Sequence, residues 1–374
     1  MAAASLTAWA VTAPGVEPLA ARELQAIGLA PDGIEAGGVG FSTDLAGVMR
    51  ANLHLRTATR VVVRIASFRA SAFYELERKA RRVPWGEVLA PGAVPRFRVT
   101  SKKSRLYHAD GIAERLQDAA GGSPTDGGPV QEFVVRVFRD ECTISADSSG
   151  ALLHQRGYRL ATAKAPLRET LAAAMLLGAG WDGTAPLLDP MCGSGTIPIE
   201  AALLARRIPP GRHRGFAFER WPSFDRAGWL RLLAEADEIV LPAAPVAIRG
   251  SDRDAGAIEA AEANAARAGV GEDVRFERRA LSALSAGPEP GWLVTNPPYG
   301  HRVGEAQRLR DLFARLGQLA RDRLPGWRLV MLSANRMLEG QTGLAWEEVF
   351  RTTNGGIRVR LLTAGGIPGQ LPGK

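Results

Sequence analysis

The stretch LLDPMCGSGTIPIEAALLA, residues 187–205, decides the fold of this chain. In it an apolar run ends in the acid Asp189, passes through a glycine-rich turn and enters an apolar helical pattern that begins at Thr196. Gly193 and Gly195 permit a tight turn and a close approach of the backbone to a ligand. A glycine-rich turn alone is weak evidence, because a dehydrogenase or any strand-to-helix turn can use one. The acid before it and the helix after it strengthen the prediction of a ligand site.

Short apolar runs alternate with longer helical patterns from residue 186 onward. This alternation predicts an α/β fold with a doubly wound parallel sheet, whose ligand lies at the carboxyl ends of the strands near the switch in strand order. The expected strands are residues 186–189, 247–252, 274–278, 292–295 and 329–333. The first 150 residues predict an α+β mixture, with strands at 7–12, 60–65, 94–100, 132–138 and 141–147, a hairpin at 33–41, and helices at 16–27, 44–55 and 109–120.

A second acid follows the next expected strand. In AIRGSDRDAGAIEAAEANA, residues 247–265, Asp252 ends the strand and a helix begins near Asp254. A carboxylate at this place can accept hydrogen bonds from both hydroxyls of a ribose. Asp252 could equally cap the helix, so its role stays open from the sequence.

The segment LVTNPPYGHRV, residues 293–303, discriminates between functions. Asn296 follows a strand and precedes two prolines and Tyr299. Prolines fix the backbone and supply no amide hydrogen, so the loop presents carbonyls and the Asn296 amide as hydrogen-bond acceptors. An amine on an aromatic ring is the complementary ligand. The alternative is a rigid loop in which Asn296 closes an Asx turn.

An exocyclic amine is a poor nucleophile until hydrogen bonds hold it toward a methyl donor. Acceptors on Asn296 and the Pro297 carbonyl would do this, and Tyr299 would stack on the base. Alignment is then the main catalytic effect, and no strong general base is required. The three motifs lie about 60 and about 45 residues apart, which fits one cofactor-bound sheet edge.

Together these motifs closely resemble the Rossmann-like methyltransferases that modify exocyclic amines. The resemblance implies S-adenosylmethionine as cofactor, bound at its methionine end by the glycine-rich turn. The cofactor-binding residues that it implies are Asp189, Met191, Gly193, Gly195, Thr196 and, on the ribose, Asp252. The catalytic residues that it implies are Asn296, Pro297 and Tyr299.

Three further segments extend the resemblance over most of the chain. GALLHQRGYRLATAKAPLRETLAAAML (150–176) is similar to the junction between a THUMP RNA-binding domain and such an enzyme. GFAFERWPSFD (215–225) and NGGIRVRLL (354–362) resemble bacterial 23S ribosomal RNA guanine-N2 methyltransferases, with the transfer-RNA guanine-N2 enzymes as close relatives. The implied domains are a ferredoxin-like domain (1–45), a THUMP domain (46–150), a linker (151–165) and the Rossmann-like methyltransferase domain (166–374).

Charge supports a polyanionic partner. Residues 50–115 hold 15 Lys or Arg and five Asp or Glu, a local excess of 15 − 5 = +10. This is a candidate RNA footprint, although a solvated basic face has the same composition. The target base has to leave any stack to reach a recessed loop, so we expect a bulge, a loop or a transiently opened nucleotide in structured RNA.

Other classes of protein are disfavoured. The two cysteines lack metal-ligand spacing, which indicates neither a metal site nor a disulfide framework. The apolar start lacks a basic region before it, and no apolar run reaches membrane-spanning length. We therefore expect a cytoplasmic monomer without metal or membrane partner.

One departure from the family concerns the adenine end of the cofactor. Relatives often carry an acid after the third strand, but residues 278–284 here read RRALSAL. A backbone carbonyl or Ser282 takes that contact, or cofactor affinity is weaker. Arg168, Glu169 and Thr170 resemble the family's cofactor-side helix, although Arg168 is equally compatible with a surface cation.

Three alternatives remain. The same fold could act on transfer-RNA guanine or on adenine in DNA, because the proline loop suits any planar amine. A catalytically inactive RNA-binding or ribosome assembly factor is conceivable given the missing acid, against which stand Gly193, Asp252 and Asn296. An NAD-type oxidoreductase would need a hydride-transfer acid or base, for which the sequence offers no suitable context.

Overall fold

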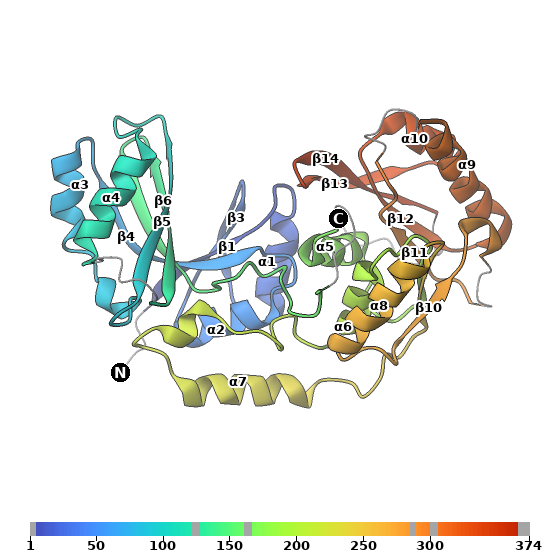
Figure 1. Cartoon of the computed structure of the whole chain (residues 1–374), viewed down its shortest axis with the longest axis horizontal. Helices are drawn as coiled ribbons and strands as arrows, with labels where there is room; N and C mark the ends of the chain where they lie inside the picture. The colour runs from blue at the N-terminus through green and yellow to red at the C-terminus, as the bar shows by residue number, and fades with distance from the viewer. Residues whose placement is uncertain (1–4, 122–127, 161–166, 285–288, 300–305, 366–374) are drawn as a thin grey trace. The chain divides into compact units, whose positions relative to one another are not determined.

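The structure, a computed structural model, describes residues 5–121, 128–160, 167–284, 289–299 and 306–365 (Figure 1). The chain forms two compact units. The amino-terminal unit comprises residues 1–12, 20–153 and 214–234, and the carboxyl-terminal unit comprises residues 13–19, 154–213 and 235–374. Most of the loop expected at 121–128 falls outside the described residues.

The amino-terminal unit contains a seven-stranded sheet in the order β2-β3-β1-β4-β7-β6-β5. Its strands are β1 (Leu6–Val11), β2 (Pro31–Glu35), β3 (Gly38–Thr43), β4 (Arg60–Arg69), β5 (Val94–Lys102), β6 (Val130–Phe138) and β7 (Glu141–Asp147). All neighbours pair antiparallel except β5 and β6, which are parallel. Apolar residues alternate along β6, where Phe133, Val135 and Val137 are buried, because successive side chains of a strand point to opposite faces.

Four α-helices lie among these strands in the sequence: α1 (Glu17–Ala26), α2 (Leu45–His54), α3 (Phe73–Ala80) and α4 (Ala109–Ala119). A further helix, α7 (Arg226–Glu238), lies mostly within residues 214–234 of the same unit. Three of the first four were predicted to within two residues of their ends. Helix α2 begins where Asp44 accepts a hydrogen bond from the Gly47 amide at 2.8 Å, a regular N-cap. Helix α3 was not predicted, because it is only eight residues long and buries only Leu76 and Ala80, which is too short a pattern to mark a helix.

The carboxyl-terminal unit contains a second seven-stranded sheet, in the order β10-β9-β8-β11-β12-β14-β13. Its strands are β8 (Leu187–Asp189), β9 (Ile248–Asp252), β10 (Val274–Arg278), β11 (Trp292–Thr295), β12 (Arg328–Ser333), β13 (Glu347–Asn354) and β14 (Ile357–Ala364). The first five in this order are parallel, as predicted. The last two form an antiparallel hairpin on β12, so the expectation of a purely parallel sheet was incomplete.

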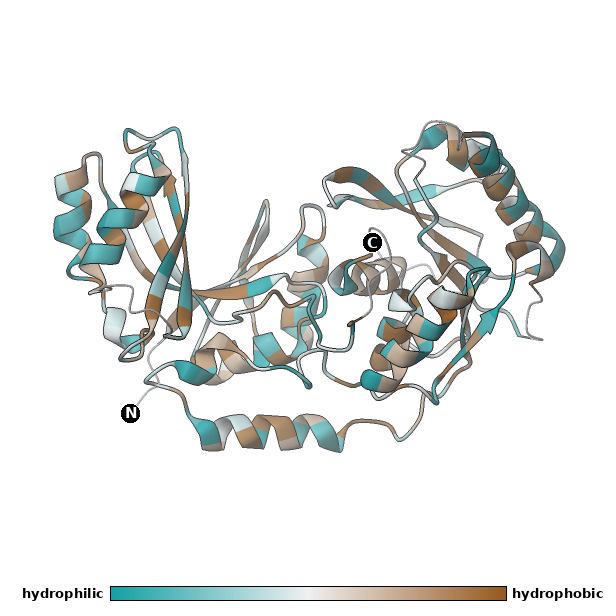
Figure 2. Cartoon of the chain, in the orientation of Figure 1, coloured by the Kyte–Doolittle hydropathy of each residue, from teal (hydrophilic) through white to brown (hydrophobic). Residues whose placement is uncertain are grey.

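Helices cover both faces of this sheet, which therefore buries successive side chains of each central strand. Leu187, Val294 and Val330 share one core with α5 (Glu169–Ala179), α6 (Thr196–Ala205) and α8 (Ala255–Arg267). Their neighbours Leu188 and Leu293 share the other core with α9 (Ala306–Arg323) and α10 (Arg336–Gln341). Helix α9 shows the matching division into hydrophobic and hydrophilic sides (Figure 2). The predicted Rossmann-like α/β fold is thus confirmed.

Strand order reverses between β8 and β11, which are neighbours in the sheet although β9 and β10 separate them in sequence. A ligand site is expected where the carboxyl ends of such strands diverge. The two ends here are Asp189 and Thr295. No helix of the described residues is both long and apolar enough to span a membrane.

Candidate active site

The glycine-rich turn joins β8 to α6, and its two predicted glycines have different structural roles. Both have left-handed backbones, with φ +52° at Gly193 and +84° at Gly195. A Cβ on Gly195 would lie 2.9 Å from Ala261 Cβ and 3.0 Å from Phe276 Cζ, so this glycine allows α6 to pack closely. A Cβ on Gly193 would meet nothing within 4 Å. Gly193 therefore borders open space at the carboxyl edge of the sheet.

Asp252 holds this turn in place with hydrogen bonds to backbone amides. Its Oδ2 accepts a hydrogen bond from the Gly193 amide at 3.1 Å, and its Oδ1 accepts one from the Asp254 amide at 3.0 Å. The cap of α8 is Asp254, which accepts from Gly256 at 2.9 Å. The structure thus excludes the helix-cap alternative for Asp252. A carboxylate has about four acceptor positions, so two remain for donors such as ribose hydroxyls.

Asp189 links β8 to β11 at the switch point. Its Oδ1 accepts hydrogen bonds from Thr295 Oγ1 at 3.0 Å and from the Met191 amide at 3.1 Å. Burial, opposed by these bonds and assisted by the charge of Asp252, raises the pKa of the Asp189 carboxyl to about 7. A cationic group placed beside it would favour the carboxylate form.

The proline loop follows β11, and its Asn296 and Tyr299 are in direct contact. The Tyr299 hydroxyl donates to Asn296 Oδ1 at 2.6 Å. An Asx turn through the residue two positions on is impossible, because that residue is Pro298 and has no amide hydrogen. The structure therefore excludes the Asx-turn alternative. Burial raises the pKa of the Tyr299 phenol to about 12, so it stays a donor at neutral pH.

Sequence analysis missed one residue of this site. Asn354 ends β13, and its Nδ2 donates to the Tyr299 hydroxyl at 3.2 Å. Gly355 and Gly356, with φ +57° and +86°, make the tight turn to β14 that places it there. Asn-Gly-Gly after a strand is a hairpin signal, but nothing local to it indicates a partner 55 residues away.

Polar side chains also form hydrogen bonds with the glycine-rich turn and with the first residue of α6. Asn264 on α8 donates to the Ser194 carbonyl at 3.0 Å. Arg159 donates to Thr196 Oγ1 at 2.6 Å and pairs with Glu169 at 3.2 Å. Burial raises the pKa of Glu169 to about 7 despite that arginine. The Thr196 hydroxyl therefore accepts from a protein side chain, which adds a structural role to its predicted cofactor role.

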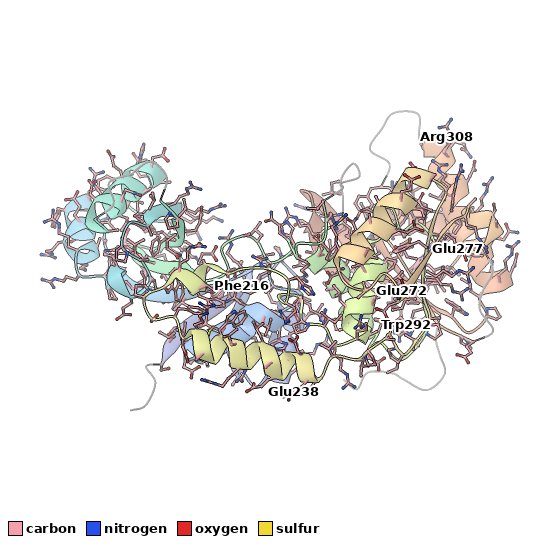
Figure 3. All side chains as sticks on the ribbon, turned by 60° about the horizontal axis from the view of Figure 1, so that its bottom comes forward. Phe216, Glu238, Glu272, Glu277, Trp292 and Arg308 are labelled. Atoms are coloured by element: carbon pink, nitrogen blue, oxygen red, sulfur yellow. The ribbon has the colours of Figure 1, made fainter. Side chains whose placement is uncertain are left out.

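The other predicted residues are placed as follows. Glu169 and Thr170 are buried, whereas Arg168 is exposed at the start of α5 without a capping side-chain bond. No carboxylate stands in residues 278–284, but Glu277 precedes them on β10 (Figure 3). Its carboxylate pairs with Arg275 and Arg279. Ser282 is exposed, and its carbonyl accepts from Arg323 at 3.0 Å.

These groups fit a cofactor with a ribose and a cationic amino-acid end. Asp252 keeps acceptor positions, Gly193 leaves room, and Asp189 offers a buried carboxylate. Among the residues that the structure describes, no cluster of three or more His, Cys, Asp or Glu side chains could hold a metal ion.

Comparison with known proteins identifies two matching families. Residues 156–362 match the family model described as "RMKL-like, methyltransferase domain", and residues 7–62 match "RlmL ferredoxin-like domain". The chain is 34% identical over 367 residues to "Putative RNA methyltransferase slr0064" of Synechocystis, covering 95% of each protein. It is 37% identical over 374 residues to "Ribosomal RNA large subunit methyltransferase K/L" of Syntrophotalea carbinolica, covering 94% of this chain and 52% of that protein. The chain thus spans about half of that large-subunit relative.

A solved structure shares the whole fold. "SMU.472, a putative methyltransferase complexed with SAH" has a TM-score of 0.89 at 29% identity, covering 98% of this chain and 99% of that one. SAH, S-adenosylhomocysteine, is the demethylated product of S-adenosylmethionine. The predicted cofactor, S-adenosylmethionine, is confirmed, and so is the ferredoxin-like domain at the start of the chain.

Proposed function

The chain belongs to the RMKL-like methyltransferase family, and from this premise we propose that it methylates the exocyclic N2 amine of a guanine in 23S ribosomal RNA. The observation that carries the proposal is the proline loop at the switch point. It places Asn296 directly after the carboxyl end of β11, beside that of β8, where we place the cofactor. Acceptors in this position suit an amine that carries two hydrogens on an aromatic ring.

The residues of the turn would hold the cofactor, and those of the loop would hold the base. Asp252 would contact the ribose, and Asp189, Met191, Gly193, Gly195 and Thr196 would border the methionine end. Bound S-adenosylmethionine supplies an electrophilic methyl group. Asn296 and the Pro297 carbonyl would accept the two hydrogens of the amine and so direct its lone pair at that methyl group. Tyr299 would pack against the base.

Proton release needs no strong base on this chain. As the bond from nitrogen to carbon forms and the bond from sulfur to carbon breaks, the amine becomes acidic. The acceptor oxygens would stabilise the positive charge that develops on the nitrogen, and the proton would pass to water after transfer. The mechanism is therefore one of orientation and electrostatics.

RNA as the substrate is supported by the basic segment and by the relatives. Residues 50–115 carry an excess of ten positive charges. The relatives from Synechocystis and Syntrophotalea carbinolica are described as acting on RNA and on large-subunit ribosomal RNA. We assign residues 1–45 to the ferredoxin-like domain, 46–150 to a THUMP domain, 151–165 to a linker and 166–374 to the methyltransferase domain, and propose that the first two bind RNA. The matched ferredoxin-like segment, 7–62, extends past the first of these bounds.

The test is methyl transfer from labelled S-adenosylmethionine to total ribosomal RNA, total transfer RNA and genomic DNA from a strain lacking the gene, followed by nucleoside analysis. N2-methylguanosine in 23S ribosomal RNA is the expected product. The same nucleoside in transfer RNA moves the target to that RNA. Methyladenine in DNA, or cofactor binding without transfer to any nucleic acid, overturns the proposal.

Asn296→Ala separates the roles of loop and turn. Because Asn296 positions the amine and not the donor, the variant should bind cofactor with unchanged affinity and lose at least about a hundredfold in kcat, the size of effect seen when one positioned transition-state hydrogen bond is removed. Calorimetry with S-adenosylhomocysteine and single-turnover methylation measure the two quantities. Full activity in this variant would refute the proposed role of the loop.

A further inference from the structure

A second group of functional side chains gathers at one end of the sheet in the amino-terminal unit. The strand registers place Lys102 of β5 opposite Phe138 of β6, Phe138 opposite Glu141 of β7, and Glu141 opposite Arg69 of β4. The loop after β5 and the turn between β6 and β7 therefore leave the sheet at the same edge.

Hydrogen bonds join these two segments into one surface. The Arg139 amide donates to the Lys102 carbonyl at 3.4 Å. The Arg105 amide donates to Asp140 Oδ1 at 2.8 Å, and the Asp140 amide donates to Ser104 Oγ at 3.1 Å. The side chains of the loop and the turn are thus carried on mutually fixed backbones.

Positive charge dominates this surface. Its exposed basic residues are Arg69, Lys102, Lys103, Arg105 and Arg139. None of the ion pairs found within the described ranges involves them. Of the two acids nearby, Asp140 accepts a backbone amide and Glu141 accepts from a serine hydroxyl at 2.8 Å. A polyanion is the complementary partner.

An aromatic ring stands beside these cations. Tyr107, in the same loop, is 81% exposed, more than any other large hydrophobic residue among those described. Exposure of a tyrosine ring to water does not stabilise the protein, but the ring can stack on an unpaired base. Proteins that bind single-stranded nucleic acid use this combination of cations and exposed aromatic rings.

The residues of this surface are not the ones that would best stabilise its backbone conformation. Four non-glycine residues have left-handed φ in the described part of the chain, and three of them are here: Lys103 at +50°, Arg139 at +52° and Asp140 at +65°. A two-residue hairpin turn with positive φ at both positions favours Asn-Gly. An arginine in that conformation is strained, and the contact of the Arg139 guanidinium with the Phe138 ring, 5.3 Å from its centre, offsets part of that strain. Contact with a polyanion is a further reason for a cation at this position.

We propose that this surface, residues 102–107 and 139–140 with Arg69, binds an unpaired segment of the RNA substrate, with Tyr107 stacked on a base and the cations on phosphates. The identity of the polyanion as RNA rests on the function proposed above. An unpaired segment fits better than a duplex, because duplex bases are stacked on one another and cannot cover the tyrosine ring.

Arg139→Asn tests the surface against its structural alternative. The variant relieves the left-handed arginine, so its melting temperature should stay equal or rise, while its affinity for a single-stranded RNA of about 12 nucleotides should fall severalfold. Loss of one phosphate contact should also lower the slope of log affinity against log salt by about 0.7. Fluorescence anisotropy over a range of salt concentrations, with the full chain, measures both.

The matched control is Arg207→Asn. Arg207 is the fourth left-handed residue, with φ +61°, and it is exposed in the carboxyl-terminal unit. Its replacement makes the same change in charge and backbone strain, and it should leave RNA affinity and salt slope unchanged. Equal losses in both variants, or no loss in Arg139→Asn, would overturn the proposal.

Substitutions at Tyr107 give a second, independent test of RNA binding by this surface. Tyr107→Ala should weaken binding of the single strand about tenfold, and Tyr107→Phe should retain it, because stacking needs the ring and not the hydroxyl. Binding of a duplex of the same sequence should be equal in all three proteins. If the wild-type chain methylates 23S ribosomal RNA but Tyr107→Ala binds the strand normally, this inference fails and the proposed function stands. If the variants lose binding as expected but no RNA is methylated, the proposed function fails instead.

Discussion

At the scale of single residues, the hydrogen bonds of the proline loop run in one direction. Tyr299 gives its only hydrogen to Asn296 Oδ1, so the bond between Asn354 and Tyr299 must be donated by the Asn354 amide. One of the two acceptor positions of Asn296 Oδ1 is thereby occupied, and the other faces the substrate amine in the proposed mechanism. Asn354 then acts through Tyr299 to orient the Asn296 amide.

This chain of bonds predicts a non-additive pair of variants. Asn354→Ala and Tyr299→Phe should each lower kcat by roughly fivefold, since each removes a hydrogen bond worth about 1 kcal/mol, and should leave cofactor affinity unchanged. The double variant should lose little more than either single one, because both break the same chain. Thr353→Ala, an exposed neighbour on β13, is the control and should have wild-type kcat. Additive losses would show that Asn354 does not act through the tyrosine.

At the scale of elements, the turn between β8 and α6 predicts two glycine variants with opposite signatures. Gly195→Ala puts a methyl group against Ala261 and Phe276 in a left-handed backbone, so it should destabilise the chain by about 2–4 kcal/mol. Gly193→Ala meets no atom within 4 Å and should cost only about 1–2 kcal/mol, from its backbone conformation. It should nevertheless weaken S-adenosylhomocysteine binding, because the methyl group enters the space proposed for the cofactor. Denaturant unfolding and calorimetry give the two quantities, and equal stability losses would contradict this division.

The elements also show what sequence can and cannot predict. Strands β8, β11 and β12 were predictable because each is an apolar run that two helical layers bury on both faces. Strands β9 and β10 are more polar, and their alternation with helical patterns predicted them. The β13–β14 hairpin was not, because β13 buries only one residue, Thr352, and so lacks the alternation that marks a strand. The role of Asn354 was hidden for another reason: its partner, Tyr299, lies 55 residues away in the sequence. The packing of residues 214–234 with the amino-terminal unit is likewise a contact between distant segments that no local pattern encodes.

At the scale of the whole molecule, two buried carboxyl groups make stability depend on pH. Burial raises the pKa of Asp189 from 3.8 to about 7 and that of Glu169 from 4.5 to about 7. Between about pH 4 and pH 7 these two groups bind more protons in the folded chain than in the unfolded chain, so they lower the free energy of unfolding as pH rises. His54, whose pKa burial lowers to about 4, acts in the opposite direction but is one group against two. The melting temperature of the cofactor-free protein should thus be lower at pH 7.5 than at pH 5.

Asp189→Asn isolates one of these groups. The amide keeps the Oδ1 that accepts from Thr295 and Met191, but it cannot ionise, so the variant should lose part of the decline in melting temperature with pH. Asp182→Asn is the control: that exposed carboxylate also accepts two bonds through Oδ1, both from Thr184, and its replacement should leave the pH profile unchanged.

The ionisation of Asp189 also links the stability of the protein to cofactor binding. If Asp189 meets the cationic end of S-adenosylmethionine, binding favours its ionised form, so cofactor affinity should rise as pH increases through about 7 and the thermal shift on adding cofactor should be larger at pH 8 than at pH 6. Asp189→Asn should be more stable than wild type at pH 8 without cofactor and should gain less from its addition. A pH-independent thermal shift in the wild-type protein would place the carboxylate away from the cofactor's charge and leave its burial to serve the β8–β11 junction alone.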